Sequence, residues 1–301
     1  MAEFIRGVVA ATATPVDEHF EPDTHRLIAH IKFLLENGCD GINLLGTTGE
    51  AASFSSAQRL KIMKAVKDSG LPMSRMMVGT GVSSLVETLE LTRAAGDLGF
   101  NGALVVPPFY YTGIDHQGLT QYVDHLLKML GHIKLPIYLY HIPQNTGVPW
   151  PIEVVSDLAR RYVGKVVGIK DSAGDIEYSK AIVKAIPQFQ VFPSSEATLS
   201  SANEEGFAGC ISATTNITSQ DSQIAWSKQG TQDGISAGKR ATEHRVILGK
   251  DSLIPSVKAT LSIIHSDPGW ARTHPPMSPR TPDQASILQN NLAKAGFLFQ
   301  S

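Results

Sequence analysis

Short apolar segments rich in β-branched residues alternate with longer segments of helical spacing along most of this 301-residue chain. The short segments are apolar throughout rather than at every second residue, which indicates strands buried on both faces. The expected strands are residues 7–16, 41–46, 76–81, 102–108, 136–143, 166–171, 189–195 and 209–216. The expected helices are residues 23–38, 55–70, 84–99, 116–131, 151–162, 175–186, 197–206 and 219–229.

Eight strand–helix units predict the α/β class and favour a closed (β/α)8 TIM barrel over an open doubly wound sheet. Counting units does not by itself exclude the open sheet, but no Gly-rich phosphate fingerprint follows the first strand. We expect residues 1–230 to form the barrel and residues 231–301 a C-terminal helical extension packed on it, within one structural domain. The extension is expected to hold helices at 231–247, 252–264 and 281–296.

Composition excludes several classes of function. The formal net charge is −2 and no Lys/Arg-rich run occurs, so a nucleic-acid partner is not expected. The two cysteines, Cys39 and Cys210, lie far apart, which argues against a disulfide framework and predicts a cytoplasmic protein. No apolar run approaches the ~18 residues of a membrane span, and Thr12 and Thr14 interrupt the N-terminal apolar run, so neither a membrane partner nor a signal peptide is expected.

Lys170 is the leading candidate for chemistry, because the active sites of TIM barrels lie at the carboxyl ends of the strands. It follows the apolar run 166–169, so its amine should project into the barrel mouth. Burial there would favour the free amine, which attacks a ketone to form an iminium. The alternative is a lysine that extends from the strand end to solvent. The strand position leaves these two interpretations evenly balanced.

Two further segments could support that chemistry. The Tyr140 phenol, at the end of another apolar run, could shuttle protons, although a tyrosine with one satisfied hydroxyl in the core is the more common case. The turn at residues 46–50 offers hydroxyls and backbone N–H groups that could hold a carboxylate. The ten histidines show no ligand spacing, so no metal is expected.

Taken together, these segments resemble the dihydrodipicolinate synthase / N-acetylneuraminate lyase family of pyruvate-dependent class I aldolases. The resemblance covers nearly the whole chain and runs in family order through ATATPV, LLGTTGEAASFS, VVPPFYYTGIDHQGL, PIYLYHIPQNTG, VVGIKDSAGD and GCISATTN. The combination of GTTGE, YxxPxxTG and GIKD is highly specific. The resemblance implies a TIM barrel and a Schiff-base lyase.

The resemblance also implies roles for individual residues. Lys170 matches the Schiff-base lysine and Tyr140 the general acid/base, whereas Thr47 and Thr48 match the pair that binds the pyruvate carboxylate and relays protons. Tyr111 matches a tyrosine that reaches into the neighbouring subunit's site. This match implies a homodimer as the minimal active unit and a homotetramer as the usual assembly. Two further positions match less directly: Tyr110 beside that tyrosine, and Ile211 in the wall of the pyruvate pocket.

One departure from the family pattern concerns the second substrate. Asn145 stands where the synthases of the family carry an arginine for the carboxylate of aspartate semialdehyde. Asparagine cannot replace that bidentate, charge-assisted pair. Together with His141, Ser194 and Glu196, it suits a polyhydroxylated or neutral aldehyde better.

The sequence therefore predicts reversible aldol cleavage of a 2-keto-3-deoxy sugar acid, or of a related 4-hydroxy-2-oxo acid, to pyruvate and an aldehyde. Neither a metal nor an organic cofactor is expected, because the iminium polarises the substrate. Three alternatives remain open. They are 4-hydroxy-tetrahydrodipicolinate synthase activity on aspartate semialdehyde, a 2-keto-3-deoxy acid dehydratase, and a non-catalytic pyruvate-binding sensor.

Overall fold

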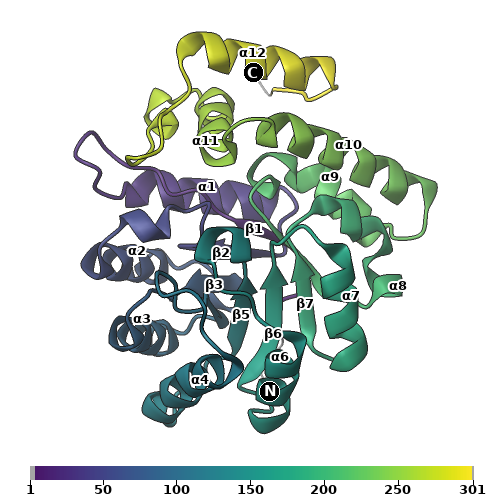
Figure 1. The fold of residues 1–301 in the computed structure, drawn as a ribbon. Helices are drawn as coiled ribbons and strands as arrows, with labels where there is room; N and C mark the ends of the chain where they lie inside the picture. The colour runs from purple at the N-terminus through teal and green to yellow at the C-terminus, as the bar shows by residue number, and fades with distance from the viewer. Residues whose placement is uncertain (1–3, 300–301) are drawn as a thin grey trace.

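A computed structural model describes residues 4–299. Its eight parallel strands form a nearly closed barrel in the order β7-β6-β5-β4-β3-β2-β1-β8 (Figure 1). The two ends of this series meet where the Ala208 N–H donates to the Val191 carbonyl oxygen at 2.9 Å. The strands are β1 Gly7–Ala11, β2 Gly41–Leu44, β3 Met76–Gly79, β4 Gly102–Val105, β5 Ile137–His141, β6 Val166–Asp171, β7 Gln190–Pro193 and β8 Gly209–Ser212.

Helices follow the strands and cover the outside of the barrel, which confirms the predicted TIM barrel (Figure 1). They are α1 Thr24–Glu36, α2 Ser56–Asp68, α3 Leu85–Asp97, α4 His116–Leu130, the short α5 Pro143–Thr146, α6 Ile152–Arg161, α7 Ile176–Ala185, α8 Ala202–Glu205 and α9 Thr215–Ser227. Short 3-10 turns add η1 Ala51–Ser53, η2 Met73–Arg75, η3 Glu196–Ser201 and η4 Pro268–Ala271.

The strands are apolar throughout because they pack on two sides. Val9 and Leu104 belong to a cluster inside the barrel. Val8 and Val105 belong to the larger cluster between the strands and the surrounding helices. Because successive residues of a strand point to opposite faces, this alternation decides which side chains can reach the barrel mouth.

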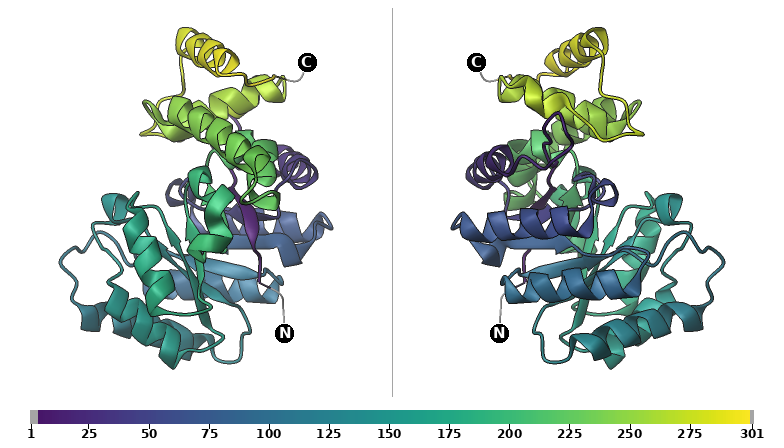
Figure 2. Two further views of the ribbon diagram at one scale, coloured as in Figure 1. Left: turned by 90° about the vertical axis from the view of Figure 1, so that its right-hand side faces the viewer. Right: turned by 90° about the vertical axis from the view of Figure 1, so that its left-hand side faces the viewer.

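The chain after β8 continues as α9 and three further helices, α10 Gln232–Gly249, α11 Leu253–Ile264 and α12 Pro282–Lys294. Figure 2 shows these last helices stacked together at one side of the barrel. A hydrophobic cluster joins Ala13 and Ile217 of the barrel to Val257 and Trp270 of this C-terminal segment. No helix within residues 4–299 has the length and hydropathy to cross a membrane.

Two predicted helices differ from the structure. The helix expected at 219–229 begins four residues earlier, as α9 at Thr215, and the strand expected before it at 209–216 ends at Ser212. Residues 197–206 form the 3-10 turns of η3 followed by the single turn of α8. Ser195 caps the start by accepting a hydrogen bond from the Ala197 N–H, and Gly206 ends the segment at a φ of 76°. The short polar residues Thr198, Ser200, Ser201 and Asn203 compete for backbone hydrogen bonds, which disfavours a regular α-helix.

Candidate active site

Lys170 and Tyr140 lie next to each other on adjacent strands. They are partners in the register between β5 and β6, and both side chains are buried, at 3% and 5% exposure. The Lys170 Nζ lies 3.3 Å from the Tyr140 hydroxyl oxygen and 4.4 Å from the centroid of the Tyr140 ring. An amine and a phenol are thereby held within one hydrogen bond near the carboxyl ends of the strands.

The Tyr140 hydroxyl has two further partners. Thr47 Oγ1 lies 3.2 Å away, and the Ser172 hydroxyl donates to it at 3.5 Å. Burial by itself would raise the pKa of Tyr140, but the Lys170 charge and the hydrogen bonds from Ser172, Thr47 and Lys170 outweigh burial and lower it. The phenolate of Tyr140 therefore forms at a lower pH than that of a free tyrosine, which suits a group that exchanges protons with a substrate.

The turn that carries Thr47 and Thr48 packs against the backbone that follows β1, and two residues of the C-terminal segment hold it in place. A Cβ at Gly49 would lie 3.0 Å from the Thr12 carbonyl oxygen, so any side chain at this position would crowd the backbone after β1. Glu50 adopts a left-handed φ of 56° and is only 3% exposed. Its carboxylate accepts hydrogen bonds from Lys258 Nζ and, at 2.7 Å, from the His274 N–H.

These residues open onto a cavity of about 270 Å³. This volume lies just below the usual range for small-molecule sites, ~300–1,000 Å³. The structure brings seven of the sequence-predicted site residues to its wall: Thr47, Thr48, Tyr140, Asn145, Lys170, Ser194 and Ile211. An adjoining cavity of about 320 Å³ shares Thr47, Tyr140 and Asn145 with it.

Two of the residues expected to contact the aldehyde, His141 and Glu196, are not brought to this cavity. His141 follows Tyr140 on β5 and therefore points to the outer face, where its ring stacks on Tyr178 at 4.1 Å between centroids. Its Nδ1 accepts the Trp150 N–H at 3.1 Å. Glu196 is completely buried and accepts hydrogen bonds from the Ser212 and Thr214 hydroxyls.

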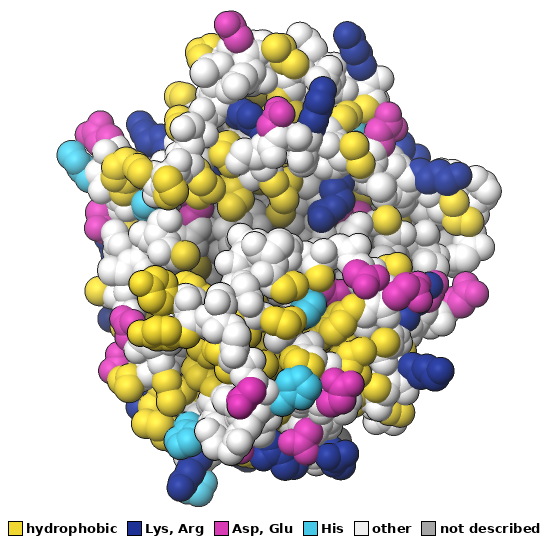
Figure 3. Space-filling model, viewed as in Figure 1, with side chains coloured by type: hydrophobic (Ala, Val, Ile, Leu, Met, Phe, Trp, Pro, Cys, Tyr) yellow, Lys and Arg dark blue, Asp and Glu magenta, His cyan; other side chains and the backbone are white. Residues whose placement is uncertain are grey.

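Tyr110 and Tyr111 lie outside the cavity and are 82% and 76% exposed. Their rings contact each other edge to face, with centroids 5.3 Å apart. Tyr110 has a left-handed φ of 87°, a conformation that side chains other than glycine rarely adopt. Hydrophobic side chains gather on the left and lower part of the face drawn in Figure 3, whereas Lys and Arg are scattered across it.

Sequence reasoning missed four polar residues in the cavity wall: Gln144, Ser172, Arg245 and Ser252. Ser172 comes directly after β6 and could have been found from its place beside Lys170. Arg245 lies in α10, and its position depends on how that helix packs over η3 and α9. No local pattern in the sequence signals such a contact.

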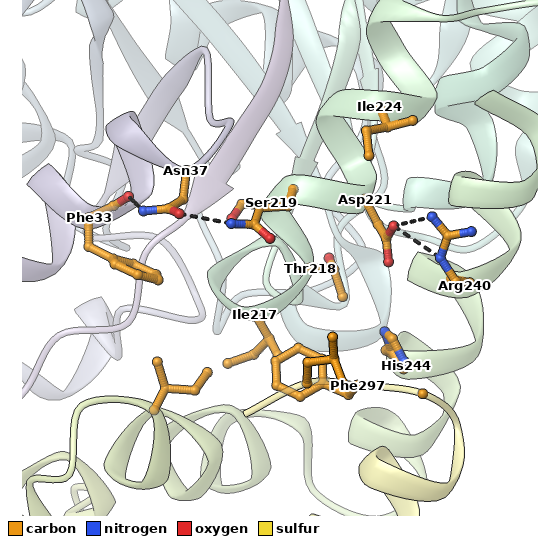
Figure 4. A pocket seen from close by; sticks show the side chains of 14 residues that line it. Phe33, Asn37, Ile217, Thr218, Ser219, Asp221, Ile224, Arg240, His244 and Phe297 are labelled. Carbon is orange, nitrogen blue, oxygen red and sulfur yellow. Dashed lines mark hydrogen bonds and ion pairs between the residues drawn. The ribbon is translucent and has the colours of Figure 1, made fainter. Parts of the chain in front are cut away.

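A separate cavity of about 260 Å³ lies away from the barrel mouth, between α1, α9, α10 and the C-terminal residues (Figure 4). Phe33, Ile217 and Phe297 contribute apolar side chains to it. Asp221 and Arg240 form an ion pair of 2.6 Å on its rim. No predicted site residue contributes to this cavity.

Within residues 4–299 there is no group of three or more His, Cys, Asp or Glu side chains placed to hold a metal ion.

Comparison with known proteins identifies the family. Residues 4–294 match the model of the Dihydrodipicolinate synthetase family. The chain belongs to this family.

Relatives of this chain carry several different names. An uncharacterized DapA-like lyase of Chloroflexus aurantiacus is 33% identical over 260 residues, covering 85% of this chain and 86% of the relative. A 4-hydroxy-tetrahydrodipicolinate synthase of Ligilactobacillus salivarius is 33% identical over 237 residues, covering 77% and 78%. The crystal structure of a chloride-inhibited dihydrodipicolinate synthase from Acinetobacter baumannii, complexed with pyruvate, superposes with a TM-score of 0.86 at 28% identity. That likeness covers 98% of this chain and 100% of the other.

This chain is thus a lyase of the dihydrodipicolinate synthetase family with a TIM-barrel fold. Two relatives with the same sequence identity to this chain carry different names. Membership of the family therefore does not by itself identify the aldehyde that the enzyme uses or releases.

Proposed function

We propose that this chain is a class I aldolase that reversibly cleaves a 2-keto-3-deoxy sugar acid, or a related 4-hydroxy-2-oxo acid, to pyruvate and an aldehyde. The observation that carries the proposal is the buried pair of Lys170 and Tyr140, 3.3 Å apart in the wall of a small cavity. Imine chemistry requires a nucleophilic amine and a nearby group that transfers protons, and this pair supplies both.

The reaction follows from this arrangement. Lys170 Nζ attacks the keto carbon, and loss of water leaves an iminium. The Tyr140 phenolate takes the proton of the C4 hydroxyl, and the C4 oxygen becomes the carbonyl of the aldehyde as the C3–C4 bond breaks. The electron pair of that bond flows to the iminium nitrogen and produces an enamine. Protonation at C3 and addition of water then release pyruvate and restore the amine.

Thr47 and Thr48 are proposed to bind the carboxylate next to the keto group. Thr47 Oγ1 is 3.2 Å from the Tyr140 hydroxyl, so one threonine can link the bound carboxylate to the phenol as a proton relay. The turn is locked by Glu50 and its partners, and this rigidity supports the alignment of the relay.

A specific observation also bears on the synthase alternative. The relative from Ligilactobacillus salivarius is named 4-hydroxy-tetrahydrodipicolinate synthase. In this chain Asn145 occupies the cavity wall at the place of the expected arginine, and an amide lacks the charge and the fork for a carboxylate. We therefore place aldol cleavage first and synthase activity second.

The assembly proposed is a homodimer at least, and a homotetramer as the usual form, in the cytoplasm. Tyr110 and Tyr111 are strongly exposed in one chain, and burying these rings against a neighbouring subunit would remove two large aromatic surfaces from water. Cys39 and Cys210 are both free and buried, as expected in a reducing compartment.

Borohydride trapping tests the proposed imine. Incubation with pyruvate and sodium borohydride should add one reduced pyruvyl group at Lys170, found by peptide mass spectrometry. Lys170→Ala should abolish the modification and reduce pyruvate release at least about 10³-fold while the fold persists by circular dichroism. Lys165→Ala, which removes an exposed amine just before β6, serves as the control and should trap pyruvate normally. Substantial cleavage by Lys170→Ala would exclude the mechanism.

A further inference from the structure

Arg245 extends from α10 to the barrel mouth and is held there by one of its nitrogens. Its Nη1 donates to the Ser212 hydroxyl oxygen at 2.9 Å and to the Thr214 hydroxyl oxygen at 3.1 Å. The same nitrogen lies 3.4 Å from Glu196 Oε2. One edge of the guanidinium is therefore anchored to β8 and η3.

Glu196 gives this anchor its rigidity. The carboxylate is completely buried, and its Oε1 accepts hydrogen bonds from Ser212 at 2.8 Å, Thr214 at 2.5 Å and Thr218 at 3.3 Å. A buried carboxylate with this many donors has little freedom to move. The Arg245 guanidinium is thus preorganised before any ligand arrives, which reduces the entropy cost of binding.

The remaining donors of Arg245 are unused. Within residues 4–299, its Nε and Nη2 make no hydrogen bond, although the side chain is only 27% exposed. Arg245 lines the same cavity as Lys170, Ser194 and Ile211. Guanidinium donors form a planar fork that matches carboxylate and phosphate oxygens in bidentate geometry.

Charge in the cavity wall supports an anionic ligand. Among the described residues of the wall, Lys170 and Arg245 are the charged side chains, and neither Asp nor Glu contributes. A 2-keto acid brings one carboxylate, which can offset the iminium at Lys170. Because Thr47 and Thr48 are proposed to bind that carboxylate, Arg245 remains for a second anionic group of the same ligand.

Acidic groups line the two adjoining cavities, and each already has a partner. In the cavity that shares Thr47 and Tyr140, Glu50 accepts hydrogen bonds from Lys258 Nζ and the His274 N–H. The others line the next cavity along β6 and β7, which shares Arg245. Asp171 accepts the Ser179 hydroxyl at 2.7 Å. Asp175 caps α7 by accepting the Glu177 N–H at 3.0 Å. Glu205 lies 3.3 Å from Lys180 Nζ.

We infer that Arg245 binds an anionic group, a carboxylate or a phosphate, at the end of the substrate remote from the keto group. The inference rests on the proposed function and narrows its substrate class to 2-keto-3-deoxy acids with a second anionic end. It revises the expectation of a neutral aldehyde, because that expectation relied partly on His141 and Glu196, which do not line the cavity. An amino aldehyde fits less well, because the wall offers no acidic partner for an ammonium.

A substrate series with the unaltered enzyme tests the inference first. Three six-carbon 2-keto-3-deoxy acids of the same stereochemistry are compared, ending in a primary alcohol, a carboxylate or a phosphate. Pyruvate release should give a kcat/KM at least about 30-fold higher for one of the charged acids than for the alcohol. A preference for the carboxylate or for the phosphate identifies which anion Arg245 takes. Equal or better cleavage of the alcohol overturns the inference.

Variants then assign the preference to Arg245. Arg245→Gln should remove most of the discrimination by raising KM for the charged acid much more than KM for the alcohol. The double variant Arg245→Gln/Glu196→Gln avoids a buried, unpaired carboxylate and keeps the test valid if the single variant unfolds. Arg240→Gln on the same helix, whose side chain pairs with Asp221 at the separate cavity, is the control and should discriminate as the unaltered enzyme does. Discrimination that survives in both Arg245 variants overturns the inference.

Failure of the proposed function gives a different result. If none of the three acids releases pyruvate and borohydride traps nothing at Lys170, the aldolase proposal itself is wrong. If pyruvate is trapped and the alcohol acid is cleaved as well as the charged ones, only the role of Arg245 is wrong.

Discussion

At the scale of single residues, the alternation of strand side chains decides which groups can react. Tyr140 faces the barrel interior, and its neighbour His141 faces outward to Tyr178. Lys170 faces inward in the same way, whereas Asp171 contacts Ser179 of α7. On each of these strands, one residue belongs to the candidate site and the next residue contacts the surrounding helix layer.

Tyr140→Phe tests the proton-transfer role. The substitution keeps the ring but removes the hydroxyl that contacts Lys170 Nζ and Thr47. We expect pyruvate release to slow by about 10²–10⁴-fold, the usual range for a general acid/base, with thermal stability nearly unchanged. Borohydride should still trap pyruvate at Lys170, because the amine remains. A Phe variant within a few-fold of normal turnover would assign the phenol a packing role only.

The sequence was sufficient to place Lys170 and Tyr140 at the barrel mouth, because both end apolar runs whose strand identity was clear. Their catalytic roles stay a prediction. The sequence was not sufficient for His141, whose outward direction requires the exact phase of β5 within the barrel. Arg245 could not be found at all, since its place in the cavity depends on contacts between α10 and segments more than 30 residues away, such as Ser212 at a separation of 33.

At the scale of elements, most predicted helices begin and end within two residues of those in the structure, because their caps are local signals. Ser55 forms a capping box with Gln58 at the start of α2, and Thr281 forms one with Gln284 at the start of α12. The contacts between elements were not predictable. One of them joins α1, α9 and α11 through His30, which is completely buried.

His30 is kept neutral mainly by its burial, and its two hydrogen-bond partners fix the tautomer of the ring. Asn216 Nδ2 donates to the Ala11 and Ala213 carbonyls, so its Oδ1 must be the acceptor for His30 Nε2–H at 3.0 Å. His30 Nδ1 then accepts from His265 Nε2–H at 3.0 Å. Burial lowers the pKa of His30 to about 3 from 6.5, although the Asn216 hydrogen bond opposes this, and His265 adds to the lowering.

This histidine predicts a loss of stability in acid. Between about pH 6.5 and pH 3 the unfolded chain binds a proton at His30 that the folded chain does not, so the free energy of unfolding falls as pH falls. One such proton contributes a slope of at most ~1.4 kcal/mol per pH unit. His30→Gln should flatten the slope in urea unfolding between pH 6.5 and 4.5, and the exposed His19→Gln should not. Equal slopes in all three proteins would show that His30 does not titrate on unfolding.

At the scale of the whole molecule, the C-terminal segment completes the barrel mouth. We propose that residues 231–301 form one structural domain with the barrel, because Lys258 of α11 and His274 after η4 hold Glu50 of the turn after β2. Lys258 and Glu50 have no exposed side-chain surface. Burial lowers the pKa of Lys258, and the Glu50 carboxylate opposes that shift.

Removing one member of this buried pair should be costly. Lys258→Met leaves the Glu50 carboxylate without its cation, and we expect the free energy of unfolding to fall by about 3–5 kcal/mol. The double variant Lys258→Met/Glu50→Gln should recover part of the loss, because an amide oxygen still accepts the His274 N–H. Lys228→Met breaks a solvent-exposed pair with Asp233 and should change stability by less than ~1 kcal/mol in urea denaturation. A Lys258→Met effect as small as the Lys228 control would contradict the structural role.

The Glu50 contacts also have a consequence for how the protein is made. Glu50 is separated from Lys258 by 208 residues and from the His274 N–H by 224. During synthesis, the turn that carries Thr47 and Thr48 leaves the ribosome long before the residues that hold it. In the nascent chain, the Glu50 carboxylate therefore has no ion-pair partner until Lys258 has been added. Lys170 is likewise synthesised before Lys258 and His274, the two residues that fix the turn on the other side of the site. Catalytic competence is therefore acquired late in translation, when most of the chain has emerged.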